Sequence, residues 1–119
     1  EVFAPAPGQG ALGLLVRSDD DPAFEVAYSL QHRPSFDRVR AERSFAFSLR
    51  HGPPGSDEVC RECVVGALAT VTADGELTLF GAVLRGQTTL QASVSGEAKE
   101  ADELGRELAQ DVRRQLAAL

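Results

Sequence analysis

The chain has 119 residues and a formal net charge of -6, with 43% hydrophobic and 25% charged residues. This length allows about one domain with a modest core, and the acidic balance argues against a nucleic-acid-binding surface, which needs clustered Lys and Arg. No apolar stretch comes near the roughly 18 residues of a membrane-spanning helix, and residues 1–5 lack the basic and apolar regions of a signal peptide. Its two cysteines form a single CxxC rather than the disulfide framework of a small secreted fold, so we expect a cytoplasmic protein.

The N-terminal residues read as part of a larger protein. Residues 4–10 form a loop rich in Pro and Gly, and residues 11–16 are apolar on both faces, which is typical of a strand buried on both sides of a sheet. No neighbouring segment supplies the rest of such a sheet. Because an initiator Met is also absent, we expect residues 1–18 to be the last strand segment of a missing N-terminal domain, and residues 19–119 to form a C-terminal domain.

Two helices follow. A run of three aspartates before Pro22 is typical of a helix N-terminus and predicts a short helix over residues 22–30. A later proline, Pro34, starts a longer helix that we expect over residues 35–50.

The longer helix carries two arginines among aromatic residues. Arg40 and Arg43 share one helical face with Phe36 and Phe47, while Phe45 belongs to a second apolar face. Either the aliphatic stems of the arginines cover apolar surface while their charges reach water, or the guanidinium groups meet carboxylates in a cleft. The sequence leaves both interpretations open.

In the C-terminal half the apolar residues first recur at every second position, which predicts strands with one buried face. We expect three strands, over residues 64–72, 76–84 and 88–95. Asp74 and Gly75 predict a tight turn between the first two. A last helix over residues 98–119 has one apolar stripe, and its Asp102 and Arg106 are spaced to pair on the surface. The predicted fold class is α+β: a three-stranded antiparallel sheet covered on one face by helices and preceded by an orphan N-terminal strand.

The glycine-rich loop is not a phosphate-binding loop. Pro7-Gly8-Gln9-Gly10 leads into a predicted strand, whereas such loops open a helix whose N-terminus meets the anion. What remains is a tight turn, with Gln9 able to donate and accept hydrogen bonds.

The CxxC, formed by Cys60 and Cys63, allows several roles. Zinc would need about four ligands, and His32 and His51 are the only histidines, at an unusual spacing. A redox CxxC usually opens a helix, whereas this one precedes a strand. The remaining roles are a nucleophilic thiol that holds a covalent group, or ordinary free cysteines.

Three segments together resemble the hydroxymethylbilane synthase (porphobilinogen deaminase) family. They are PGQGALG at residues 7–13, RAERSF at residues 40–45, and VGALA at residues 65–69 with the turn and strand that follow. Their order and approximate spacing match the family across nearly the whole chain. The GQGALG and AER elements are fairly specific as a pair.

The resemblance implies a part of an enzyme. The whole enzyme polymerises four porphobilinogen units into hydroxymethylbilane with release of ammonia, in tetrapyrrole and haem biosynthesis. This chain would be its C-terminal portion, an α+β domain in which a cysteine holds the dipyrromethane cofactor through a thioether. The catalytic aspartate and most arginines would lie in the missing N-terminal domains, so the resemblance implies no catalytic and no metal-binding residue here, and no activity in isolation.

The resemblance also implies which residues serve the cofactor. They are Cys60 or Cys63 as the carrier, Arg43 on the AER helix, and Gln9 on the loop at the substrate cleft. The family usually reads Leu-x-Gly-Gly-Cys-x-x-Pro-x-Gly, whereas here an insertion rich in Pro, Gly and acidic residues precedes Cys60. Counted back from Gly66, Cys60 is one residue and Cys63 two residues out of the family register. Cys60 is the better candidate.

Two other functions stay open. One is a small α+β binding module whose CxxC holds zinc or a disulfide. The other is an interaction domain whose apolar strand at residues 11–16 docks onto the sheet of a partner.

Overall fold

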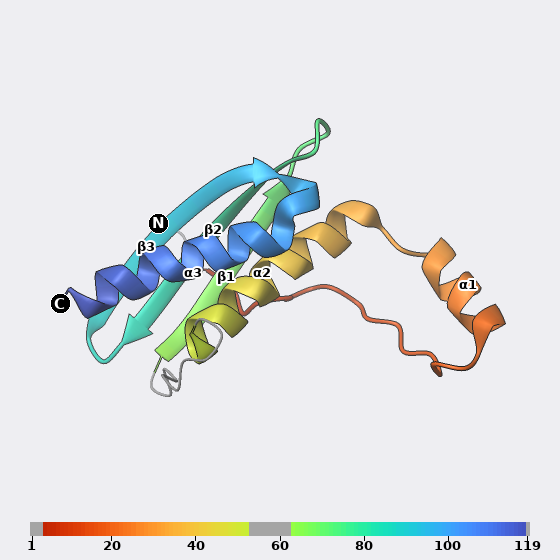
Figure 1. The fold of residues 1–119 in the computed structure, drawn as a ribbon, viewed down its shortest axis with the longest axis horizontal. Coiled ribbons are helices and arrows are strands. Elements are labelled where there is room, and N and C mark those ends of the chain that lie inside the picture. Colours follow the sequence, from red (N-terminus) through yellow and green to blue (C-terminus); the bar gives the residue numbers. More distant parts are fainter. Residues whose placement is uncertain (1–3, 53–62, 119) are drawn as a thin grey trace.

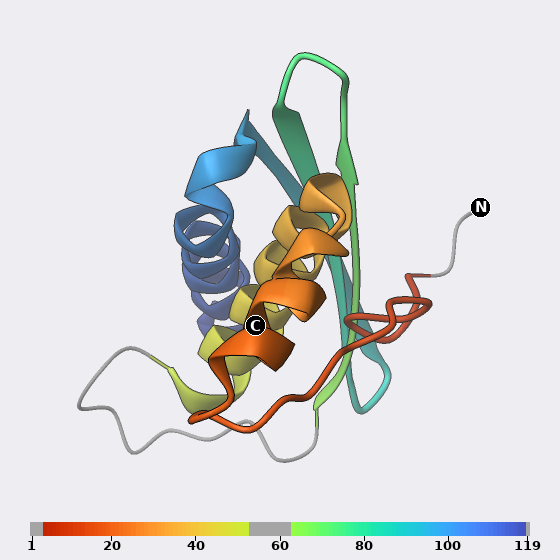
Figure 2. The same ribbon diagram turned by 90° about the vertical axis from the view of Figure 1, so that its right-hand side faces the viewer.

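A computed structural model describes residues 4–52 and 63–118, and it shows a helix layer on one face of a small sheet (Figures 1 and 2). The sheet is antiparallel with the order β1-β2-β3. Its strands are β1 (Cys63–Val71), β2 (Glu76–Arg85) and β3 (Thr88–Glu97). The helices are α1 (Asp21–Ser29), α2 (Arg33–His51) and α3 (Ala101–Ala117), with a short 3-10 turn at Ala98–Glu100. The predicted α+β class is confirmed.

The sheet follows the predicted alternation. In β1 the side chains of Val65, Ala67 and Ala69 are buried while those between them are more exposed. Gly75 has a φ of 83°, the left-handed conformation that glycine adopts without strain, and this closes the predicted turn between β1 and β2.

The core lies between the sheet and helices α2 and α3. Its largest fully buried side chains come from all three elements and are Phe45, Leu49, Leu77, Leu79, Val83, Leu108 and Val112. Two glycines make this packing close. A Cβ on Gly81 would lie 2.6 Å from Cζ of Phe45, and one on Gly105 would lie 2.7 Å from the backbone nitrogen of Phe45.

Helix α2 buries the second of its two apolar faces. Ala41, Phe45 and Leu49 are fully buried, whereas Phe36 and Phe47 of the arginine-bearing face are 40% and 65% exposed. The arginine-bearing face of α2 therefore points mainly away from the core.

The N-terminal part forms an arm that leaves the helix–sheet body. Residues 11–17 have no regular structure, and α1 stands away from the other helices (Figure 1). None of the α1 residues is buried. The large hydrophobic side chains exposed on this arm are Leu12, Leu14, Leu15, Phe24, Val26, Tyr28 and Leu30.

The strand predicted over residues 11–16 is not formed by this chain. A strand needs hydrogen-bond partners on a neighbouring strand, and the sheet order shows that none of the three described strands pairs with this segment. Within the described residues, no helix is both long enough and apolar enough to cross a membrane.

Candidate functional site

The glycine-rich turn is fastened to α2 and β1 by one buried carboxylate. Glu42 is 6% exposed, and its Oε1 accepts a hydrogen bond of 2.8 Å from the backbone N–H of Gly8. Its Oε2 accepts another of 2.8 Å from the backbone N–H of Ala69. The segment before the turn adds a third bond, of 2.8 Å, from the N–H of Ala67 to the carbonyl of Pro5. Residues 4–8 thus lie along β1, on the side away from α3 (Figure 2).

Two of the predicted cofactor residues present exposed side chains. Gln9 lies at the exposed tip of the turn over residues 7–10, and Arg43 follows Glu42 on α2. Within the described chain, no hydrogen bond or ion pair engages either side chain. Both polar groups are therefore available to a ligand.

Cys63 is the first residue of β1, and it is 8% exposed and disulfide-bonded. A sulfur in a disulfide cannot at the same time form a thioether or bind a metal as a thiolate. The other predicted carrier, Cys60, and most of the insertion before it lie outside the described residues.

Arg40 meets carboxylates, as one of the two interpretations predicts, but they belong to its own chain. Its Nη2 donates a 2.7 Å hydrogen bond to Asp102 of α3, and its Nη1 lies 3.6 Å from Asp37. The hydrogen bond to Asp102, together with the charges of both carboxylates, raises the pKa of Arg40 above its ordinary value. The predicted Asp102–Arg106 pair is wrong, because Asp102 binds Arg40 while Arg106 pairs with Glu103.

The two histidines have structural roles at opposite ends of α2. His32 is the N-cap, where its Nδ1 accepts a hydrogen bond of 3.3 Å from the N–H of Ser35, and His51 packs on Phe47 at the last residue of the helix. With 19 residues at about 1.5 Å each, the helix separates the two by roughly 28 Å, so they cannot share a metal ion. Among the residues described, no cluster of three or more His, Cys, Asp or Glu could hold one.

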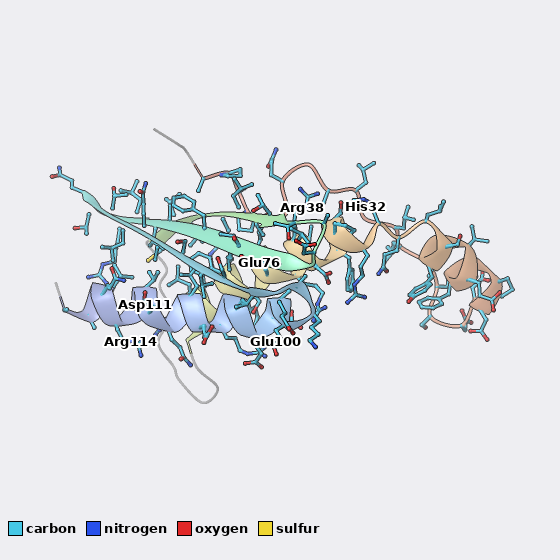
Figure 3. The ribbon with its side chains drawn as sticks, turned by 90° about the horizontal axis from the view of Figure 1, so that it is seen from above. His32, Arg38, Glu76, Glu100, Asp111 and Arg114 are labelled. Carbon is cyan, nitrogen blue, oxygen red and sulfur yellow. The ribbon has the colours of Figure 1, made fainter. Side chains whose placement is uncertain are left out.

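Arg38 is a polar residue that the sequence reasoning did not single out. It lies with His32 near the start of α2 (Figure 3), and its Nη2 donates a 3.0 Å hydrogen bond to Ser35. Its Nε is buried and has no hydrogen-bond partner in the described part of the chain. Only the fold reveals this, because burial of the nitrogen depends on what packs against α2.

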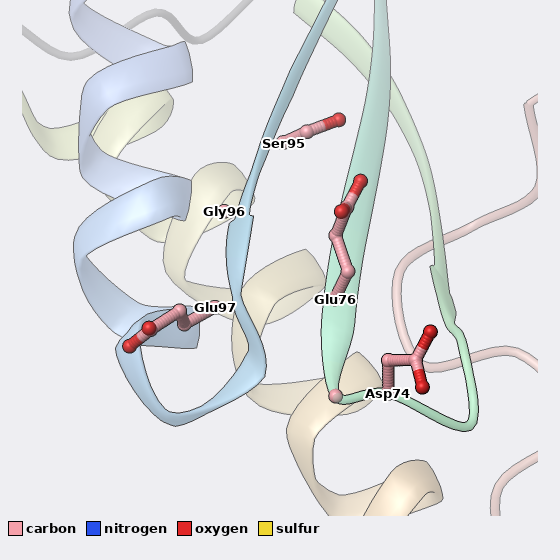
Figure 4. Close-up of a pocket in the computed structure, with 6 residues that line it drawn as sticks. Asp74, Glu76, Ser95, Gly96 and Glu97 are labelled. Carbon is pink, nitrogen blue, oxygen red and sulfur yellow. The ribbon is translucent and has the colours of Figure 1, made fainter.

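A shallow depression lies at the end of the sheet where β2 begins and β3 ends, and none of the candidate residues lines it. It has a volume of about 410 Å³ and is lined by Asp74, Gly75, Glu76, Ser95, Gly96 and Glu97 (Figure 4). Its acidic side chains would repel a ligand that carries carboxylates.

Comparison with known proteins confirms the resemblance. No protein-family model matches the chain. A porphobilinogen deaminase of Thermus thermophilus is 48% identical over 115 residues, which are 93% of this chain and 35% of the relative. Those of Deinococcus radiodurans and Synechococcus elongatus are each 38% identical, over 99% and 92% of this chain and over 36% and 32% of the relatives. The chain therefore spans about a third of the length of these curated relatives. It is related, over nearly all of its residues, to the C-terminal portion of the porphobilinogen deaminases.

Proposed function

We propose that this chain is the C-terminal, cofactor-carrying domain of an enzyme that joins four porphobilinogen units into hydroxymethylbilane and releases ammonia. The observation that carries the proposal is the similarity to named porphobilinogen deaminases over 92–99% of the chain. In this proposal residues 19–119 form the C-terminal domain and residues 1–18 are the last strand segment of an N-terminal domain. The start of that segment, residues 4–8, is bonded to α2 and β1 of the C-terminal domain.

The exposed arm is an argument for a partner domain that would cover it. Leu12 is 98% and Leu15 is 100% exposed, although burying one such side chain is worth about 1.5–3 kcal/mol. A sheet of the N-terminal domains would take up residues 11–16 as a further strand and satisfy their backbone groups as well.

The cofactor of this proposal is dipyrromethane, bound through a thioether to Cys60 or Cys63. When bound, it supplies the end on which the growing tetrapyrrole is built. Because thioether formation needs a free thiol, carriage at Cys63 requires its disulfide to be reduced. A cytoplasmic enzyme would meet this condition, since glutathione and thioredoxin keep thiols reduced there.

Arg43 and Gln9 would bind rather than react. The guanidinium of Arg43 can form two parallel hydrogen bonds with an acetate or propionate carboxylate, and it has no carboxylate partner within the described chain. Gln9 can donate a hydrogen bond through its amide nitrogen and accept one through its oxygen. The carboxylate that manages the pyrrole cation would come from the N-terminal domains.

Cysteine variants of the full-length enzyme test the proposal. We expect the wild type to consume porphobilinogen, one of Cys60→Ser and Cys63→Ser to abolish consumption, and the other to retain most of it. The 119-residue chain alone should consume none. Full activity in the double variant would contradict covalent carriage by either cysteine.

The disulfide at Cys63 favours a second candidate, a binding module stabilised by its CxxC rather than a cofactor carrier. Thiol titration before and after reduction, together with zinc analysis, separates the two. A full-length protein that keeps the disulfide in reducing buffer, or binds about one zinc, and carries no covalent adduct would favour the module.

A further inference from the structure

Glu42 is a buried carboxylate that is held by backbone amides. At 6% exposed it has lost most of its water, yet within the described chain it pairs with no Arg or Lys. Its two oxygens instead accept from Gly8 and Ala69, residues 34 and 27 positions away along the chain. Because a buried charge is costly unless it is hydrogen-bonded, removing either bond should leave an oxygen unsatisfied.

These bonds divide the N-terminal segment at Gly10. Before it, the segment is held by Glu42 through Gly8 and by the bond between Pro5 and Ala67. The contact is close, since a Cβ on Gly66 would lie 2.6 Å from the carbonyl oxygen of Ala4. From Gly10 onward the segment is open to solvent. A Cβ placed on Gly10 or Gly13 would meet no atom within 4 Å, and the leucines of the arm are exposed. The turn is therefore held against α2 and β1 of the α+β domain.

We propose that Glu42 is a positioning residue that holds the turn over residues 7–10, and with it Gln9, on the cofactor-carrying domain. This rests on the proposed function, which gives Gln9 its place at the substrate cleft. Glu42 itself faces two backbone amides and so acts on substrate through the turn. Its loss should weaken substrate binding more than it slows the chemical step.

Hydrogen exchange of the full-length enzyme tests the contact itself. In Glu42→Gln an amide nitrogen replaces one acceptor oxygen and faces an N–H donor, so the peptide covering residues 4–11 should exchange at least severalfold faster. The matched control is Asp37→Asn, because Asp37 is also buried on α2 but binds Arg33 and Arg40 instead of the turn. Unchanged exchange in Glu42→Gln, or equal acceleration in the control, would overturn the proposal.

A second variant covers the case in which Glu42→Gln does not fold. Gly66→Ala leaves the carboxylate in place but directs a methyl group at Ala4, so it should displace the same segment and give the same faster exchange. If Gly66→Ala folds with slow exchange over residues 4–11, the segment is not held as we propose.

Kinetics test whether Glu42 acts through Gln9. We expect Glu42→Gln to raise KM for porphobilinogen about tenfold with a smaller change in kcat, and Gln9→Ala to do the same. The double variant should be no worse than the more impaired single variant, because both changes remove one function. Additive losses, or a fall in kcat alone, would indicate a structural role only. If the wild type does not consume porphobilinogen, the proposed function fails, while the exchange result still decides whether Glu42 holds the turn.

Discussion

At the scale of single residues, Gly105 marks the closest approach of α3 to α2. A Cβ there would lie 2.6 Å from Cβ of Ser44 and 2.7 Å from the backbone nitrogen of Phe45. Gly105→Ala should gain up to about 1 kcal/mol of helix propensity, but a backbone atom cannot move aside as a flexible side chain can. We therefore expect a net loss of about 1–3 kcal/mol in urea-induced unfolding. Gly13→Ala is the control, since its Cβ meets nothing within 4 Å, and a neutral Gly105→Ala would contradict this packing.

The Arg40–Asp102 pair is the polar counterpart of this helix contact. It joins α2 to α3 at 2.7 Å, but the two side chains remain 28% and 46% exposed, so solvent screens it. A double-mutant cycle with Arg40→Ala and Asp102→Ala should give a coupling of about 0.5–1 kcal/mol, which falls at high salt. The Arg106–Glu103 pair within α3 is the comparison and should couple more weakly, because both side chains are more exposed. Equal coupling in both pairs would contradict the geometry.

At the scale of elements, the sequence predicts the features that neighbouring residues determine, such as where a helix begins and where a hairpin turns. The aspartates before Pro22 place the start of α1, where Asp20 accepts a 3.0 Å bond from the N–H of Ala23. Gly75 closes the first hairpin as expected. The predicted bounds of these elements differ from the observed ones by a few residues at most.

Long-range contacts explain what the sequence leaves open. Whether Arg40 reaches water or a carboxylate depends on Asp102, which lies far along the chain. That Glu42 is buried depends on two amides brought by other elements, and the bare pattern of α2 shows only a charged residue beside an apolar face. The strand over residues 11–16 is the extreme case, because its hydrogen-bond partners are not among the described strands.

The exposed leucines of the arm lead to a prediction about self-association. Leu12 and Leu15 contribute almost fully exposed apolar surface, which should drive self-association of the 119-residue chain. Changing both to Ser should lower the sedimentation-average mass at a given concentration and leave the urea midpoint of the helix–sheet body unchanged. A lower midpoint would mean that the arm packs on the body, contrary to the structure.

At the scale of the whole molecule, the chain combines a body with its own core and an arm without one. The body buries Phe45 and Leu108 between its own sheet and helices, so we expect it to fold as a unit. The arm exposes leucines and backbone groups without strand partners, so we expect a sheet of another domain to cover it. Between them, Glu42 holds the glycine-rich turn on the body. This division is what we expect of a cofactor-carrying domain joined to N-terminal domains.

The mass of the full-length enzyme tests the central claim most directly. Purified under reducing conditions and digested, it should yield a peptide containing Cys60 and Cys63 that is heavier by one dipyrromethane, and the adduct should vanish in one of the two cysteine-to-serine variants. A peptide with two unmodified thiols, from an enzyme that nevertheless consumes porphobilinogen, would contradict the claim that this domain carries the cofactor.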